Sequence, residues 1–320
     1  MMNFFHIFSS KTKRRSRESS PEQNPLTSPL LYREKEHALR KFSFSELENA
    51  TNNFNRSQWI RDGQLGRVYK GSIKPPGGQG APLVVEITKL HNIHSMQGHE
   101  KWLAAVEFLG DVEHPNLVKL LGYCLVDNKK ARQSQRLLVY EYMPNKSLEY
   151  HLFNRELPPI PWIKRLQILL GAAQGLAYLH EGLETQVYSS TPYDDYYAPE
   201  YMMTGHLTSK SDIWSFGNVL YEILSGRKFV DRNLPESEQK LIEWVNQFPG
   251  SKRFQMLMDP RLNNQYYYYY YYYSGTVARK LAKLAGSCLP RHPKGRPTMS
   301  HIVNVLQEVI REQEDEIKSR

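Results

Sequence analysis

The stretch that decides the fold reads Thr204-Gly-His-Leu-Thr-Ser-Lys-Ser-Asp-Ile-Trp-Ser-Phe-Gly217, and Tyr197-Ala-Pro-Glu-Tyr201 stands just before it. From residue 212 to residue 225, apolar residues occur on nearly every side of a helical projection. A helix that is apolar nearly all round is normally buried. The sequence therefore predicts a globular core organised around residues 212–225.

Helical spacing continues on both sides of this core segment. Residues 162–180 repeat apolar side chains at steps of three and four, and another helix is predicted from about residue 298. The apolar positions are Trp162, Leu166, Leu169, Ala173, Leu176 and, in the last helix, Ile302, Val305, Leu306, Val309 and Ile310.

The first half of the chain has a different pattern. Strand-like runs occur at residues 66–73, 82–87 and 137–142, a Pro/Gly cluster at 75–80 indicates a hairpin loop, and a helix is predicted at 102–110. Ser45 is the predicted N-cap of a short helix that ends near Ala50. Strands followed by helices predict an α+β fold with two lobes. We expect a basic tail at 1–40, a β-rich lobe at 41–143, a helical lobe at 144–312 and a short tail at 313–320.

Composition is that of a soluble intracellular protein. The 320 residues are 40% hydrophobic and 23% charged, and the two cysteines cannot form a disulfide framework. The formal charge is +9, and residues 1–40 hold eight Lys/Arg against four Glu. This basic segment is a solvated tail, a weak contact for an anionic inner leaflet or a nuclear address. No base-reading motif occurs, so we expect no nucleic-acid partner.

Several longer motifs follow one another along the chain. They are Phe42-Ser-Phe-Ser-Glu-Leu-Glu-Asn-Ala-Thr-Asn-Asn-Phe54, Gln97-Gly-His-Glu-Lys-Trp102, His114-Pro-Asn-Leu-Val-Lys-Leu-Leu-Gly-Tyr-Cys124, Leu137-Leu-Val-Tyr-Glu-Tyr-Met143, Tyr197-Ala-Pro-Glu-Tyr201 and Arg296-Pro-Thr-Met299. In this order they resemble a known family, the plant receptor-like cytoplasmic kinases of subfamily VII. The resemblance extends from about residue 42 to residue 310, and it implies a two-lobed protein-kinase fold acting in signalling such as plant immunity.

A kinase of this family needs a glycine-rich loop that approaches the phosphates of ATP. The corresponding window is Arg61-Asp-Gly63-Gln-Leu-Gly66, in which Arg61 replaces the first glycine. The window predicts either a phosphate clamp or an ordinary hairpin turn. With Gly63 and Gly66, the residues expected to line a vestigial ATP pocket are Val68, Tyr140 and Met143.

The lysine that grips the phosphates is missing from its expected place. The family's V-A-I-K run is Val85-Glu86-Ile87-Thr88 here, with Lys89 following. Adjacent strand residues point to opposite faces, so Lys89 cannot replace the lost lysine without a register slip or bulge. Glu86 stands where the family has a small residue facing adenine, and a buried carboxylate there would repel a nucleotide.

The glutamate that pairs with this lysine is also replaced. Its position is Ala105, and Glu107 lies about 200° around the predicted helix, facing away.

The catalytic loop cannot be found. The family has H-R-D-x-x-x-x-N and D-F-G before Ala-Pro-Glu. Here residues 181–197 contain neither motif, and Ser189 and Ser190 stand where Arg and Asp are required. Asp194 and Asp195 are interpreted as a solvated turn. We therefore expect no catalytic residue, no metal site and no required cofactor, with ATP binding doubtful.

Other features concern the scaffold. The resemblance implies a Glu200–Arg296 ion pair and leaves Asp212 without the catalytic-loop amides that it normally binds. His91, His94 and His99 are interpreted as a solvated loop rather than a metal site. The run Tyr266 to Tyr273 is interpreted as a repeat expansion without function.

Three hypotheses follow. The leading one is a pseudokinase that binds protein partners, such as receptor kinases, in the cytoplasm or beneath the plasma membrane. The second is an active ATP-dependent serine/threonine kinase whose sequence here lacks a segment. The third is the product of a decaying gene that folds poorly.

Overall fold

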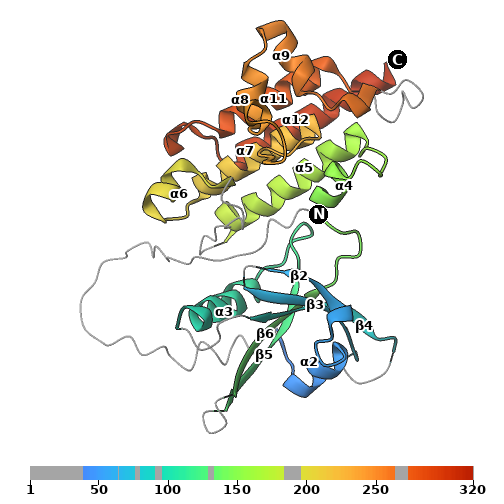
Figure 1. Ribbon diagram of the computed structural model, residues 1–320, viewed down its shortest axis with the longest axis vertical. Helices are drawn as coiled ribbons and strands as arrows, with labels where there is room; N and C mark the ends of the chain where they lie inside the picture. The colour runs from blue at the N-terminus through green and yellow to red at the C-terminus, as the bar shows by residue number, and fades with distance from the viewer. Residues whose placement is uncertain are drawn as a thin grey trace. The chain divides into compact units, whose positions relative to one another are not determined.

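A computed structural model describes residues 39–63, 65–75, 80–90, 96–128, 133–183, 196–263 and 273–319. Two compact units meet in sequence at Pro144 and Asn145. The predicted α+β architecture is confirmed, because the first unit is built on a β-sheet and the second on helices (Figure 1). Predictions for the N-terminal tail, for residues 184–195, for His91 and His94 and for the tyrosine run before Tyr273 fall outside the described residues.

The first unit contains a six-stranded sheet in the order β1-β5-β6-β4-β3-β2. Strand β1 lies parallel to β5, and the other neighbours are antiparallel. The strands are β1 (Arg40–Lys41), β2 (Trp59–Asp62), β3 (Gly66–Ile73), β4 (Leu83–Leu90), β5 (Leu120–Asn128) and β6 (Gln133–Glu141); the helices are α2 (Phe44–Ala50) and α3 (Met96–Leu109).

One face of this sheet packs against α2, and we call it the α2 face. Alternate residues of β4 and β6, together with Leu47 of α2, form a buried cluster. The helix is capped by Ser43, whose hydroxyl accepts a hydrogen bond from the Glu46 amide at 3.1 Å. The prediction that Ser45 caps this helix is therefore wrong, because Ser45 lies within its first turn. The strand residues of the cluster are Ile73, Val85, Ile87, Cys124, Leu137 and Val139.

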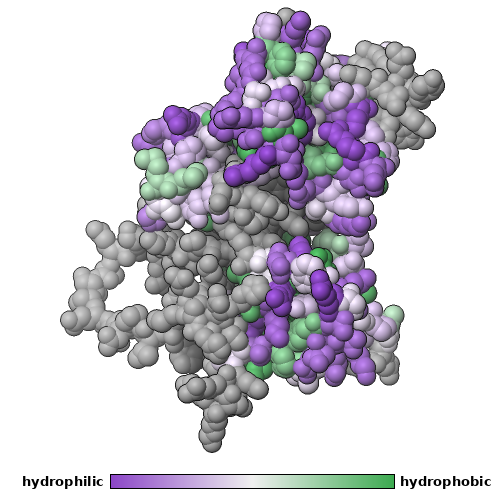
Figure 2. Space-filling model, viewed as in Figure 1, coloured by the Kyte–Doolittle hydropathy of each residue, from purple (hydrophilic) through white to green (hydrophobic). Residues whose placement is uncertain are grey.

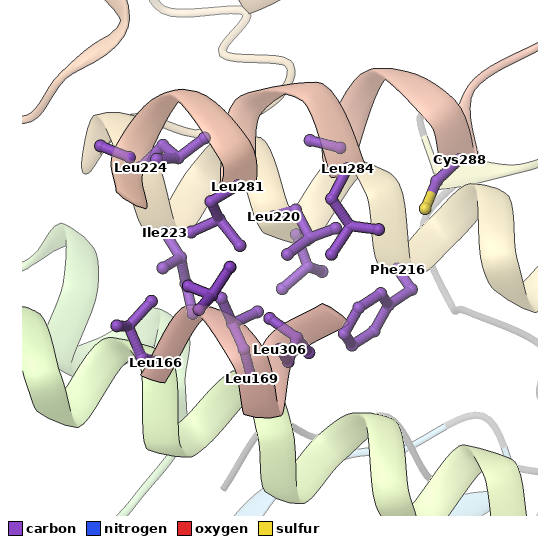
Figure 3. Close-up of a cluster of buried hydrophobic side chains, with 14 of the residues drawn as sticks. Leu166, Leu169, Phe216, Leu220, Ile223, Leu224, Leu281, Leu284, Cys288 and Leu306 are labelled. Carbon is purple, nitrogen blue, oxygen red and sulfur yellow. The ribbon is translucent and has the colours of Figure 1, made fainter. Parts of the chain in front are cut away.

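The second unit is helical, and its core gathers around α7 (Figure 3). Side chains of α5, α7, α11 and α12 converge there, including Leu169, Phe216, Leu281 and Leu306. The helices are α4 (Leu148–Phe153), α5 (Trp162–Ala177), α6 (Pro199–Thr204), α7 (Ser209–Ser225), α8 (Leu241–Asn246), α9 (Gly250–Leu257), α11 (Gly275–Cys288) and α12 (Met299–Lys318), with a π-helical turn at Tyr178–Gly182.

Local signals fix the ends of α7. Thr208 and Ser211 form a capping box at its start, and Gly226 ends it in the left-handed conformation with φ of 60°. A glycine adopts this conformation without strain from a Cβ atom. The predicted buried helix is thus present, and it starts three residues earlier than residue 212.

Helix α12 continues beyond residue 312, where the sequence predicts a tail. Gln313 is fully buried, and its side-chain oxygen accepts hydrogen bonds from Trp162 Nε1 at 2.9 Å and from the Ser274 amide at 3.0 Å. The last turns of α12 are therefore tied to the start of α5 and to the start of α11.

Polar side chains cover most of the visible described surface of each unit (Figure 2). An apolar area lies over α6, where Met202 and Met203 are 68% and 86% exposed. Within the described ranges, no helix combines the length and the apolar character needed to cross a membrane.

Candidate nucleotide face of the sheet unit

The predicted pocket residues belong to the sheet face opposite α2, which we call the α3 face. Cross-strand partners share a face of a sheet. Val68 of β3 is paired with Thr88 of β4, and Thr88 is paired with Leu138 of β6. Tyr123 of β5 pairs with Leu138 and makes an edge contact with Trp102 of α3.

The glycine turn is a closed hairpin. The Gly63 amide donates to the Gly66 carbonyl at 2.8 Å, and the Gly66 amide donates to the Gly63 carbonyl at 3.2 Å. A Cβ atom on Gly66 would lie 1.9 Å from the Lys89 carbonyl oxygen, so a glycine is needed for strand approach. Both amides are used inside the hairpin, which favours the interpretation as a turn over a phosphate clamp.

Lys89 lies on the α2 face, as the strand alternation predicts. Thr88 is buried on the α3 face, whereas the Lys89 ammonium lies 4.3 Å from the ring centroid of Phe54 and 5.5 Å from that of Phe44. Burial lowers the pKa of Lys89, and aromatic rings stabilise a cation that is partly removed from water. Strand register therefore fixes Lys89 away from the α3 face.

Helix α3 supplies no carboxylate to this face at the two positions considered. Ala105 is fully buried and Glu107 is exposed. Both observations agree with the predicted orientation of the helix.

An ion pair lies on the α3 face. Arg61 Nη2 lies 2.5 Å from Glu86 Oε1, and the two side chains are only 25% and 17% exposed. Arg61 is paired with Val68, and Glu86 is paired with Lys70, so the ion pair crosses β3 from β2 to β4. Burial raises the pKa of Glu86, although Arg61 opposes the shift.

The remaining predicted pocket residues are Val68, Tyr140 and Met143. Val68 is fully buried. Tyr140 is the cross-strand partner of Glu86, and burial, followed by the negative charge of Glu86, raises the pKa of its phenol. Met143 follows β6 and is partly exposed. The α3 face thus brings Val68 and Tyr140 together with the charged side chains of Arg61 and Glu86, which stand at altered positions of two kinase motifs.

In the helical unit, the predicted Glu200–Arg296 ion pair is confirmed. Arg296 donates to both carboxylate oxygens of Glu200, at 2.7 and 2.8 Å, and to the Lys210 carbonyl at 2.7 Å. Burial alone would raise the pKa of Glu200, but the hydrogen bonds from Arg296 outweigh it and hold this pKa below its usual value.

Asp212, for which the catalytic-loop amides are not expected as partners, has a side-chain partner in His180. His180 Nε2 lies 2.7 Å from Asp212 Oδ2, and both side chains are almost fully buried. The π-helical turn Tyr178–Gly182 places His180 at this position. The repeating pattern of residues 162–180 included His180 as a core position, but it contained no signal for the carboxylate partner.

Tyr196 anchors the chain that leads into α6. Its hydroxyl hydrogen-bonds Glu222, and its carbonyl accepts a hydrogen bond from Ser215 at 3.0 Å. The Tyr196 side chain also packs against the core of the helical unit. No group of three or more His, Cys, Asp and Glu within the described ranges is arranged to hold a metal ion.

Comparisons with known proteins agree with the kinase resemblance of the sequence. A profile of the protein tyrosine and serine/threonine kinase family matches residues 54–183, and a protein kinase domain profile matches residues 181–306. The probable serine/threonine-protein kinase PBL20 of Arabidopsis thaliana is 42% identical over 343 positions, covering 92% of this chain and 85% of the relative. The chain belongs to the protein kinase family.

Its relatives within the family are receptor-like cytoplasmic kinases. The serine/threonine-protein kinase PCRK1 of Arabidopsis thaliana is 39% identical, over 85% of this chain and 72% of the relative, and PCRK2 is 38% identical. The match to PBL20 extends over 343 positions although this kinase-family chain has 320 residues, so PBL20 has residues without a counterpart here. The two profile matches also meet at residues 181–183, where the predicted gap begins.

Proposed function

We propose that this kinase-family chain is a pseudokinase that acts by binding protein partners in intracellular signalling. The observation that carries the proposal is the α3 face of β4, where Thr88 occupies the position of the phosphate-binding lysine. Transfer of a phosphoryl group relies on positioning and on charge stabilisation, so the loss of this cation removes a main contribution.

Losses elsewhere support the same conclusion. Ala105 replaces the glutamate of α3, and the sequence from residue 181 to residue 197 contains no H-R-D or D-F-G motif. These positions serve one reaction and lie in both units of the chain. One loss could be compensated by a neighbouring group, but a base, two metal ligands and a lysine must all be replaced here.

The test is a phosphoryl-transfer assay on purified protein with Mg-ATP and no other kinase. We expect no autophosphorylation and no labelling of a generic substrate, with an active serine/threonine kinase assayed in parallel. A cooperative thermal melt must accompany the negative result, because an unfolded sample would also be inactive. Transfer above that of a sample without enzyme would contradict the proposal.

A second candidate function is an active serine/threonine kinase from which a segment is missing. It is favoured by the meeting of the two profile matches at residues 181–183. Sequencing the transcript tests this candidate, since a longer transcript would contain H-R-D and D-F-G. Thr88 and Ala105 lie outside the gap and would remain in the longer chain.

Protein partners are expected from the signalling role of the relatives. We propose receptor kinases or other signalling proteins as partners, with weak membrane contact through the basic residues of the first 40 positions. The exposed Met202 and Met203 of α6 are suited to a binding surface, because methionine side chains are flexible and polarizable. Crosslinking in plant cells, compared between the full chain and a chain lacking residues 1–38, would test both proposals.

A further inference from the structure

The Arg61–Glu86 ion pair occupies the sheet face on which a nucleotide would have to lie. It connects β2 and β4 across β3, and β3 carries Val68 at this level. Val68 is the residue expected to cover an adenine ring, and it is fully buried. An adenine ring could reach Val68 only if the atoms now covering it moved away.

The ion pair also brings two opposite charges close together. Its N–O distance is 2.5 Å, and both side chains are largely removed from water. Charge-assisted hydrogen bonds of this length are stronger than neutral ones. Arg61 Nη1 is buried and has no hydrogen-bond partner among the described residues, so this position costs the guanidinium part of its hydration.

We propose that Arg61 and Glu86 form a built-in plug that closes the α3 face of the sheet to adenine nucleotides. The plug acts through volume and through charge, because the Glu86 carboxylate repels phosphate groups while the Arg61 side chain fills the space beside Val68. This inference deepens the proposed function, since it names the feature that keeps the nucleotide out of an inactive kinase fold.

The plug predicts a different result for each single variant and for the double variant. Arg61→Ala leaves the Glu86 carboxylate unpaired on the face, so nucleotide should still be excluded. Glu86→Ala removes the repulsion and leaves a buried guanidinium that can pair with a phosphate, so ATP should bind weakly. The double variant R61A/E86A should bind both ATP and adenosine, because the space beside Val68 is then open.

The experiment is a thermal shift of each variant in the full chain, with ATP and with adenosine, each with and without Mg²⁺. We expect a midpoint rise of several degrees for R61A/E86A at ligand concentrations near 100 times the dissociation constant, and none for the unaltered chain. The matched control is R40A/E46A, which removes another ion pair of 2.5 Å with side chains 33% and 30% exposed in the same unit. This control should show no shift.

The outcomes separate the plug from the proposed function. A double variant that melts cooperatively but shows no shift would overturn the plug and leave the pseudokinase proposal intact. Nucleotide binding by the unaltered chain would also overturn the plug, while the phosphoryl-transfer assay would still decide activity. If R61A/E86A does not melt cooperatively, R61A/E86Q takes its place; it removes both charges and the volume of the Arg61 side chain, so a shift with adenosine is expected, and its absence would count against the plug.

Discussion

Asn218 lies in the middle of α7 and is fully buried, and neither its amide nitrogen nor its amide oxygen has a hydrogen-bond partner among the described residues. A buried polar group without a partner costs about 1–3 kcal/mol. We predict that Asn218→Val raises the free energy of unfolding by about that amount, because valine has a similar size and needs no partner. Urea unfolding measures the change.

Asn304 provides the control for this substitution. It is exposed on α12, and asparagine and valine have similar helix propensities, so Asn304→Val should change stability by less than about 0.5 kcal/mol. A loss of stability in Asn218→Val would show that the buried amide has a partner after all.

Glu222 is a second residue whose contribution to stability can be measured by itself, because that contribution depends on pH. Burial raises its pKa to about 7, against the hydrogen bonds from Tyr196 and the Phe229 amide; nearby Glu149 raises it further and Lys228 lowers it. Between about pH 4.5 and pH 7 the folded chain retains a proton that the unfolded chain has lost. Stability should therefore fall as the pH rises through this window, by about 3 kcal/mol in total.

We predict that Glu222→Gln removes this part of the pH dependence. The glutamine is neutral at every pH, and its amide oxygen can still accept both hydrogen bonds. Urea unfolding at pH 5, 6, 7 and 8 should show the variant gaining stability relative to the unaltered chain as the pH rises. The exposed Glu243→Gln serves as control, and a constant difference across the series would contradict the prediction.

At the scale of single elements, strand register explains the main features of the candidate site. Alternation along β4 placed Thr88 and Lys89 on opposite faces, and helical spacing placed Ala105 and Glu107 on opposite sides of α3. These assignments follow from the two-residue period of a strand and the 3.6-residue period of a helix, so the sequence alone could predict them. The Arg61–Glu86 pair was not predicted, because it depends on which strands become neighbours across β3.

The same reasoning explains what was missed in the helical unit. The pairing of His180 with Asp212 depends on a π-helical turn at the end of α5, which has no recognisable sequence signal. Helices α8, α9 and α11 were not predicted, although α11 contributes buried side chains to the main core. The end of α12 was placed too early because its last turns are rich in charged residues, while Gln313 and Glu316 bind them to Trp162 and Ser274.

Helix α12 therefore makes a prediction of its own. Truncation after Glu312 removes Gln313 and Glu316, and so leaves the indole of Trp162 and both the amide and the hydroxyl of Ser274 without their acceptors. Each lost partner of a buried donor costs about 1–3 kcal/mol, so the melting midpoint should drop by several degrees. Removal of residues 318–320 alone should leave the midpoint unchanged, and equal midpoints for the two truncations would contradict the role of Gln313.

At the scale of the whole molecule, the two units differ in which family features they retain. The helical unit keeps its scaffold contacts, including Glu200–Arg296 and His180–Asp212, and a core centred on α7. The sheet unit has six strands and helix α3, and its α3 face carries Thr88 and an ion pair. The contacts that hold the helical unit together therefore involve other residues than those on which phosphoryl transfer in the sheet unit would depend.

Because the altered positions lie in both units, an experiment can distinguish a pseudokinase from an active kinase with a missing segment. We predict that inserting the corresponding segment of PBL20 between Leu183 and Tyr196 does not give phosphoryl transfer, because the insertion leaves Thr88, Ala105 and the Arg61–Glu86 pair unchanged in the sheet unit. The insertion combined with Thr88→Lys, Ala105→Glu and R61G/E86A supplies the missing groups in both units, and its activity with Mg-ATP is the positive comparison. Transfer by the insertion variant alone would show that the gap is the only obstacle, and would favour the active kinase.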